Sequence, residues 1–241
     1  MLYIAYLPKP KGEHVDQRKV HKILKWYTKL TGDKYSIIAA PGYLSKTDHT
    51  IGVYLHELSG LLTDNFNRRI GLLNGMNGHY KITNSPHTII EEHNAQLSNH
   101  SFAQIQLNAK KEYDHRKMMC FFCEKGAGHS EITLENLDEF FENVHVGAVL
   151  IGSSNQSKTS YFEEFANKGE ADILMIDPGE DLSVQKAFNA FENEQKGEWA
   201  GLLEGDDGIV ITKSFHGGGH YHTQDFLKDI LRELLINGLE E

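Results

Sequence analysis

The chain has little cysteine and no long apolar run. Only two of its 241 residues are cysteines, Cys120 and Cys123, which are too few for a disulfide framework. No apolar stretch approaches the roughly 20 residues that a membrane-spanning helix needs. The first residues, 1–7, lack a basic region and lead directly into Pro8 and Pro10, which is typical of a first strand rather than a signal peptide. We therefore expect a cytoplasmic protein without a membrane partner.

Positive charge is also scarce. The chain holds 24 lysines and arginines against 34 acidic residues, which gives a formal net charge of -10. Such a chain repels a polyanion at long range unless basic groups cluster locally. Its 14 histidines would become cationic below about pH 6.5 and would reverse part of this field. We therefore expect any phosphate chemistry to favour mildly acidic pH.

The hydrophobic pattern alternates between strands and helices, with no low-complexity linker and no internal repeat. Short apolar or alternating runs predict strands near residues 1–7, 35–40, 69–73, 102–107, 115–123, 146–151, 171–176 and 209–211. Helical spacing predicts helices near residues 16–32, 48–62, 161–166, 183–191 and 223–237. This alternation predicts an α/β sandwich.

Two polar segments stand at the ends of apolar runs and suit phosphate chemistry. Asp114–Lys117 opens one expected strand, and residues i and i+2 of a strand face the same side, so His115 and Lys117 would project together. Residues 152–157, Gly-Ser-Ser-Asn-Gln-Ser, directly follow another strand and offer hydroxyls, an amide and backbone N–H groups. Together the two segments predict a phosphate pocket.

Each segment is weak by itself. A chain with 14 histidines should contain His-x-Lys about once by chance, and a second copy, His79–Lys81, lies in a stretch that reads as loop. A solvated strand end at His115 and an ordinary turn after residue 152 remain the plain alternatives. The strand placement favours the copy at His115 and Lys117 as the functional one.

In combination the two segments resemble the phospholipase D superfamily, whose signature is His-x-Lys followed by a Gly-Ser-x-Asn turn. That superfamily includes nucleases, restriction endonucleases and phospholipid-cleaving enzymes. The resemblance covers roughly residues 35–191 and is greatest to the single-copy, restriction-endonuclease-like branch, with residues 38–45 and 69–73 similar to its first two strands. It implies a mixed β-sheet sandwiched by helices, with one motif half per chain. Residues 1–195 would form the catalytic domain, and residues 196–241 an extension with an amphipathic helix packed on it.

The resemblance also implies roles for individual residues. His115 would attack phosphorus to form a phosphohistidine, and the same histidine of a two-fold partner would protonate the leaving oxygen, so the active enzyme would be a homodimer. Asn167–Glu170 is similar to the family's Asn-x-x-Glu element, with Glu170 orienting the imidazolium. No metal and no cofactor is expected. The implied catalytic residues are His115, Lys117, Asn155 and Glu170, and the implied phosphate-binding residues are Ser153, Ser154 and Ser157.

The chain departs from the family pattern at one position. The fuller motif places an aspartate five residues after the lysine, where this chain has Phe122, with Glu124 two residues further on. Some family members lack this aspartate and use a downstream asparagine and glutamate, which is why Asn155 and Glu170 are the candidates.

Two further clusters have plainer readings. Cys120 and Cys123 imitate a redox or half-zinc motif, but they lie in an apolar strand, which favours core cysteines. Residues 216–222 hold three histidines among glycines and could ligate a metal, yet the glycines favour a flexible loop near the substrate.

The function expected from these residues is metal-independent hydrolysis of phosphodiesters by an endonuclease that binds and cuts DNA. The alternatives are a phospholipid or small-phosphodiester hydrolase or transferase of the same superfamily, and a non-catalytic relative. A nuclease should carry a basic strip beside His115. The sequence offers four cationic candidates for that strip: Arg116, Lys125, Lys158 and Lys168.

Overall fold

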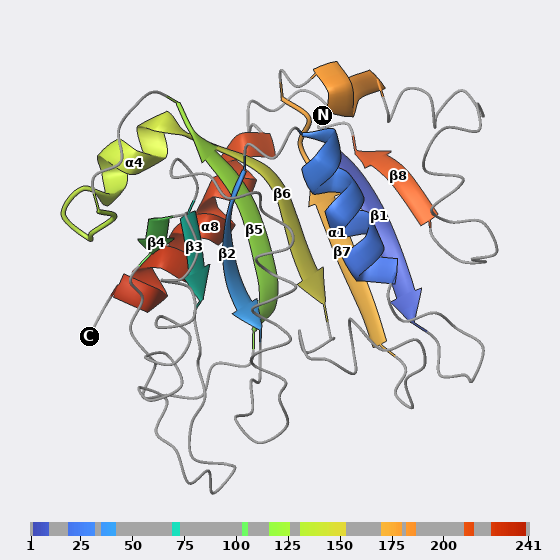
Figure 1. The fold of residues 1–241 in the computed structure, drawn as a ribbon, viewed down its shortest axis with the longest axis horizontal. Helices are drawn as coiled ribbons and strands as arrows, with labels where there is room; N and C mark the ends of the chain where they lie inside the picture. Colours follow the sequence, from blue (N-terminus) through green and yellow to red (C-terminus); the bar gives the residue numbers. More distant parts are fainter. Residues whose placement is uncertain are drawn as a thin grey trace, which may run out of the picture.

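The protein is built on a β-sheet with helices on both faces (Figure 1). The structure, a computed structural model, describes residues 2–9, 19–31, 35–41, 69–72, 103–105, 116–125, 131–152, 170–179, 182–186, 210–214 and 223–239. Within these residues eight strands form one sheet in the order β4-β3-β2-β5-β6-β7-β1-β8. In chain order the strands are β1 (Leu2–Lys9), β2 (Ser36–Pro41), β3 (Arg69–Leu72), β4 (Ala103–Ile105), β5 (Lys117–Glu124), β6 (Val144–Gly152), β7 (Glu170–Ile176) and β8 (Val210–Ser214).

The sheet is mixed. β2, β3 and β4 run parallel to one another, whereas β2 and β5 and all the pairs from β5 to β8 are antiparallel. Three labelled helices accompany the sheet, α1 (Lys19–Leu30), α4 (Leu137–Asn143) and α8 (Thr223–Leu239), together with a helical segment at residues 182–186. The expected α/β class is therefore confirmed.

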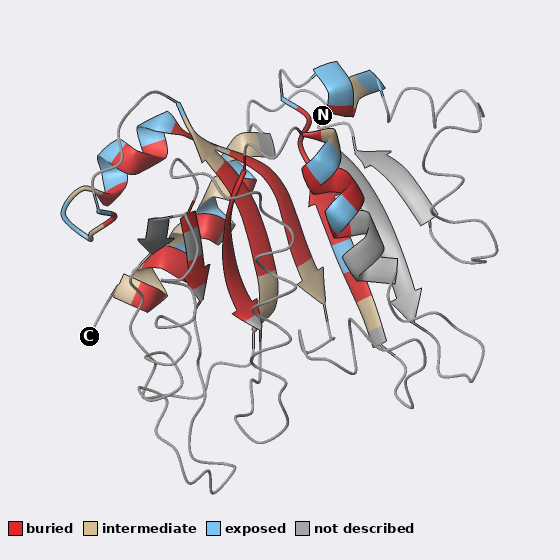
Figure 2. Cartoon of the chain, in the orientation of Figure 1, coloured by how far each residue is buried: buried red, intermediate tan, exposed pale blue. Residues whose placement is uncertain are grey.

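One face of the sheet packs against α1. Alternate residues of a strand point to opposite sides, and Phe121 of β5 points toward α1, where it meets Tyr27 edge-on with ring centroids 5.5 Å apart. Tyr27 also stacks on Tyr35, just before β2, at 5.8 Å. These rings are buried, and Figure 2 shows buried residues running along β2, β5, β6 and β7.

The opposite face packs against α8 and α4. Leu227, Leu231, Leu234 and Leu235 lie at helical spacing on α8, and all four are fully buried. They join a core cluster with the other alternating set of strand residues, among them Ile38, Cys120, Phe122 and Val149. α4 adds Phe140, which meets Phe122 edge-on at 5.8 Å, and Phe141, whose ring lies 4.4 Å from the guanidinium carbon of Arg232 on α8.

All eight expected strands are present, each within a few residues of its predicted bounds, and β8 lies at the sheet edge. The helices expected near residues 16–32 and 223–237 are confirmed by α1 and α8. The helix expected at 183–191 is described only as far as residue 186, and those expected at 48–62 and 161–166 lie outside the described residues.

Sequence reasoning missed α4. Its signal was present but short: Asp138 and Glu139 stand in the first turn, and Leu137, Phe140 and Phe141 form a buried face at helical spacing.

The expected C-terminal extension shares the sheet and the core with the rest of the chain. β8 pairs with β1, so that Tyr6 is opposite Val210, and α8 packs on β6 and β2. The domain boundary near residue 195 stays a prediction. Among the helices of the described residues, none is both long enough and apolar enough to cross a membrane.

Candidate active site

β5, β6 and β7 are neighbours in the sheet, and the adjacent ends of these strands carry residues of the predicted site. β5 begins at Lys117, β6 ends at Gly152 and β7 begins at Glu170. Met118 is paired with Ile151, and Gly152 with Asp172, so these strand ends lie side by side. The register therefore brings Lys117, Gly152 and the Glu170 backbone together, at the lower ends of these strands in Figure 1.

Lys117 is positioned by the strand alternation. It stands two residues before Met119 and four before Phe121, so it belongs to the face that α1 covers. Its side chain is half-buried, whereas Met119 and Phe121 are buried. The lysine thus marks the point where this face of β5 passes from core to surface.

The other predicted site residues are only partly placed. His115 directly precedes the described residue Arg116, and Ser153, Ser154, Asn155 and Ser157 follow Gly152; all five lie outside the described residues. For Glu170 the structure gives the backbone, paired with Lys9 of β1. The assignments of His115, Asn155, Glu170 and the three serines therefore remain predictions.

Sequence reasoning missed one acidic residue at this edge, Asp172. Its exposed fraction is 1%, although it lies only two positions inside β7. A methyl group added at Gly152 would overlap the Asp172 carboxylate and would also approach the Ala171 carbonyl oxygen to 2.8 Å. Gly152 is therefore required as glycine because its missing side chain leaves room for this carboxylate. The available signal was an aspartate directly before the apolar run 173–176 of this strand.

Neither Phe122, at the expected aspartate position, nor Glu124, two residues further on, lies beside Lys117. Phe122 is fully buried on the opposite face from Lys117, against Phe140. Glu124 ends β5, about 23 Å from Lys117 at the usual rise per strand residue. There it forms a buried ion pair with Arg69 of β3, with 3.2 Å between Arg69 Nε and Glu124 Oε2.

Of the basic strip expected beside His115, the structure describes two members, Arg116 and Lys125. The Arg116 guanidinium lies 3.0 Å from Glu233 Oε1 on α8, because Arg116 belongs to the face opposite Lys117. Lys125 follows the far end of β5 and lies away from Lys117. For Lys125 the expectation was wrong, whereas for Arg116 it stays a prediction; Lys158 and Lys168 lie outside the described residues.

The two cysteines do not form a ligand pair. Three positions apart in a strand, they point to opposite faces, with Cys120 fully buried in the α8 core and Cys123 half-buried. Burial raises the pKa of the Cys120 thiol far above its ordinary range, so this thiol stays protonated. The reading of Cys120 as a core residue is confirmed.

This difference predicts selective thiol labelling. The thiolate is the reactive form, so we expect a disulfide reagent such as Ellman's reagent at pH 8 to modify Cys123 while Cys120 remains protected until the protein unfolds. Counting released chromophore in buffer and then in guanidinium chloride measures both. In Cys123→Ser no rapid phase should remain, and rapid labelling of that variant would contradict the burial of Cys120.

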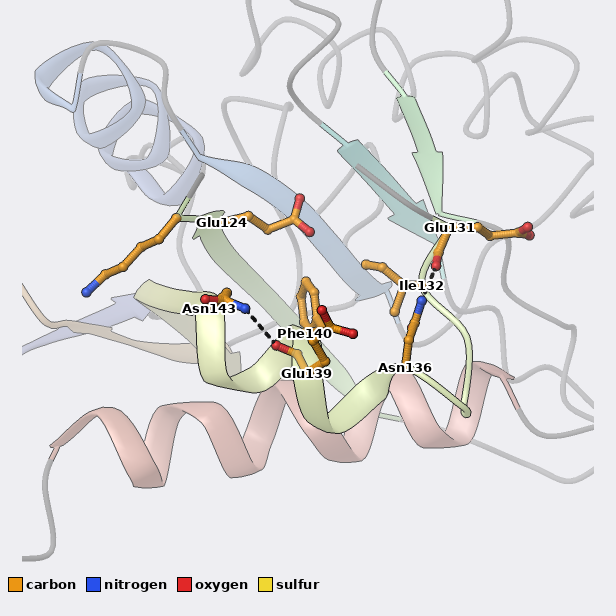
Figure 3. Close-up of a pocket in the computed structure, with 8 residues that line it drawn as sticks. Glu124, Glu131, Ile132, Asn136, Glu139, Phe140 and Asn143 are labelled. Atoms are coloured by element: carbon orange, nitrogen blue, oxygen red, sulfur yellow. Dashed lines mark hydrogen bonds between the residues drawn. The ribbon is translucent and has the colours of Figure 1, made fainter. Parts of the chain in front are cut away.

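A surface pocket lies at the opposite edge of the sheet, between the end of β5 and α4 (Figure 3). Glu124, Glu131 and Glu139 line it together with a single cation, Lys125. A phosphate group would be repelled by this excess of carboxylates. In the part of the chain that the structure describes, no three histidine, cysteine or acidic residues cluster closely enough to hold a metal ion, and the histidines at 216–222 lie outside that part.

Comparison with known proteins adds no family to this description: no protein-family model matches the chain, and neither does any curated protein.

Proposed function

We propose that the chain is a metal-independent phosphodiesterase of the phospholipase D type, acting as an endonuclease on DNA through a homodimer. The observation that carries the proposal is the convergence of the β5, β6 and β7 ends, which brings Lys117, Gly152 and the Glu170 backbone to one edge of the sheet. Such a convergence is what a His-x-Lys pair and a Gly-Ser-Ser-Asn turn need if they are to bind one phosphate. A chance occurrence of the two motifs would not require their strands to be neighbours.

In the proposed reaction the imidazole of His115 attacks phosphorus, and a P–N bond forms as the P–O bond to the leaving group breaks. The leaving oxygen takes a proton from His115 of the partner subunit. Water then attacks phosphorus, its proton passes to that same partner histidine, and the P–N bond breaks to release the phosphate ester. Both histidines return to their starting state, so no further reactant is required.

Lys117 would stabilise the negative charge that develops on the non-bridging phosphate oxygens. Its half-buried position suits this role, because a partly desolvated ammonium interacts more strongly with an anion than an exposed one does. Ser153, Ser154, Ser157 and Asn155 would add hydrogen bonds from the turn, and Glu170 would hold the imidazolium of His115.

Charge supports a second candidate, hydrolysis or transfer on a small phosphodiester. The net charge is -10, Arg116 is paired with Glu233, and Lys125 is at the far edge of the sheet. DNA binding needs several cations along the backbone, whereas a small phosphodiester needs only the pocket itself. The substrate comparison below separates the two candidates.

The test is hydrolysis of plasmid DNA and of bis(p-nitrophenyl) phosphate in EDTA, at mildly acidic and at neutral pH, with His115→Ala purified in parallel. We expect activity that survives the chelator and is greater at the acidic pH. Cleavage of the plasmid that weakens steeply with salt supports the nuclease, and turnover of the small ester alone supports the second candidate. Activity that EDTA removes, or that His115→Ala retains, would refute the mechanism.

A further inference from the structure

Asp172 is a buried carboxylate at the proposed site that the reaction above does not use. Burying a charged group costs free energy unless another charge or several hydrogen bonds compensate it. With an exposed fraction of 1%, Asp172 is as buried as Leu174 and Ile176, which follow it on the same face of β7. An aspartate at this position therefore needs a structural or functional reason.

The geometry around Gly152 indicates where the carboxylate lies. Asp172 Oδ1 occupies the space that a Cβ atom of Gly152 would take, so the carboxylate lies over β6 rather than over its own strand. Lys117 lies across from Gly152 on the β5 side. Met118 is opposite Ile151, so the residue before Met118 is opposite the residue after Ile151. Both side chains belong to the face that α1 covers.

The separation is short enough for an ion pair. Cβ atoms at opposed positions of neighbouring antiparallel strands are about 4.5–5.5 Å apart. Because Asp172 Oδ1 stands in place of the Gly152 Cβ, it lies about that far from the Cβ of Lys117. The four-carbon stem of a lysine spans such a distance. Gly152 thus leaves the space over β6 in which the Lys117 ammonium group can approach the Asp172 carboxylate.

We propose that Asp172 is a positioning residue, which holds the ammonium group of Lys117 where it binds the scissile phosphate. This inference rests on the proposed phosphodiesterase function. Asp172 touches no reacting atom in this scheme; it limits the rotamers of a flexible side chain and keeps its charge directed at the phosphate pocket. The absence of a side chain at position 152 leaves room for this carboxylate over β6.

The chain offers a matched control for this role. Asp177 is also buried, with an exposed fraction of 6%, and lies directly after the other end of β7. Its carboxylate accepts hydrogen bonds from the Gly179 backbone N–H and from the Gln224 side chain, at 3.0 and 2.6 Å. Asp177→Asn therefore tests the loss of a buried carboxylate from the same part of the fold, far from Lys117.

The first test needs no catalytic activity. NMR titration of the lysine side chains, with the Lys117 signal assigned from Lys117→Met, compares wild type with Asp172→Asn and Asp177→Asn. A neighbouring carboxylate favours the charged ammonium, so we expect Asp172→Asn to lower the pKa of Lys117 and Asp177→Asn to leave it unchanged. An unchanged Lys117 titration in folded Asp172→Asn would overturn the inference, whether or not the chain is an enzyme.

The second test is kinetic. On bis(p-nitrophenyl) phosphate in EDTA, we expect Asp172→Asn to lower kcat roughly 10- to 100-fold, the scale of a misplaced catalytic group, with a much smaller change in KM. Asp177→Asn should keep the wild-type kcat. Equal kcat losses in both variants would mean that Asp172 only supports the fold and would overturn its positioning role. If wild type shows no phosphodiesterase activity, the proposed function fails and the titration alone decides whether Asp172 and Lys117 are paired.

Discussion

His115→Ala is expected to lower phosphodiester hydrolysis by about 10⁴-fold or more, the scale seen when a nucleophile is removed. The loss should appear in kcat rather than in KM, because the imidazole forms a bond to phosphorus only as the reaction proceeds. Single-turnover and steady-state rates on bis(p-nitrophenyl) phosphate measure it. Acid-quenched wild type incubated with substrate should also contain a phosphorus–nitrogen adduct, detectable by mass spectrometry of the peptide that holds His115, and His115→Ala should lack it.

Mixing this variant with wild type tests the dimer. If one site uses His115 from each of two chains, mixed dimers are inactive, and an equal mixture after subunit exchange retains about a quarter of the wild-type activity. If each chain works alone, half of the activity remains. His79→Ala serves as the control, because its His-x-Lys copy lies outside the expected strand, and it should keep wild-type activity.

Glu124→Ala is expected to destabilise the fold by about 3–5 kcal/mol, because it leaves the buried guanidinium of Arg69 without its carboxylate. The two side chains are 4% and 12% exposed, and Arg69 Nη2 and Nε approach the two carboxylate oxygens at 3.3 and 3.2 Å. The pair links β3 to β5 across β2, where the Ser36 hydroxyl oxygen accepts a hydrogen bond from the Arg69 backbone N–H. Denaturant unfolding of the variant measures the change in the free energy of unfolding.

The matched control is an exposed ion pair, Arg232 with Asp138, in which the side chains are 36% and 92% exposed. Asp138→Ala should change the free energy of unfolding by less than about 1 kcal/mol, since solvent screens that pair. The double substitution Arg69→Met with Glu124→Leu should recover much of the loss, because both buried charges are then removed together. Equal effects of Glu124→Ala and Asp138→Ala would contradict the burial of the first pair.

The strands were predictable from the sequence because each one leaves a local mark. Buried β-branched and apolar runs such as 146–151 and alternating runs such as 102–107 differ from the helical spacing of Leu227, Leu231 and Leu234. α4 escaped because seven residues complete fewer than two turns, too few for a periodic pattern. Its stability comes from contacts with Phe122 and Arg232, which are distant in sequence.

Some residues of the candidate site were likewise predictable from the sequence, and others were not. The His-x-Lys spacing of His115 and Lys117 and the Gly-Ser-Ser-Asn sequence from Gly152 were visible as motifs, but Asp172 was not, because an aspartate near the start of a strand is usually exposed. The ion pair between Arg116 and Glu233 could not be predicted either, since 117 positions separate the two residues.

The sequence by itself determined the α/β class, the strands and the terminal helices, and the two motifs that suggest phosphate chemistry, because local spacing and backbone preference govern these features. Tertiary structure alone decided the strand order, and with it that β5, β6 and β7 have neighbouring ends, that the Asp172 carboxylate lies over Gly152, and that Arg116 faces away from Lys117. The physical reason is that strand neighbours are selected by hydrogen bonding and burial summed over the whole sheet, which no single segment of the chain encodes.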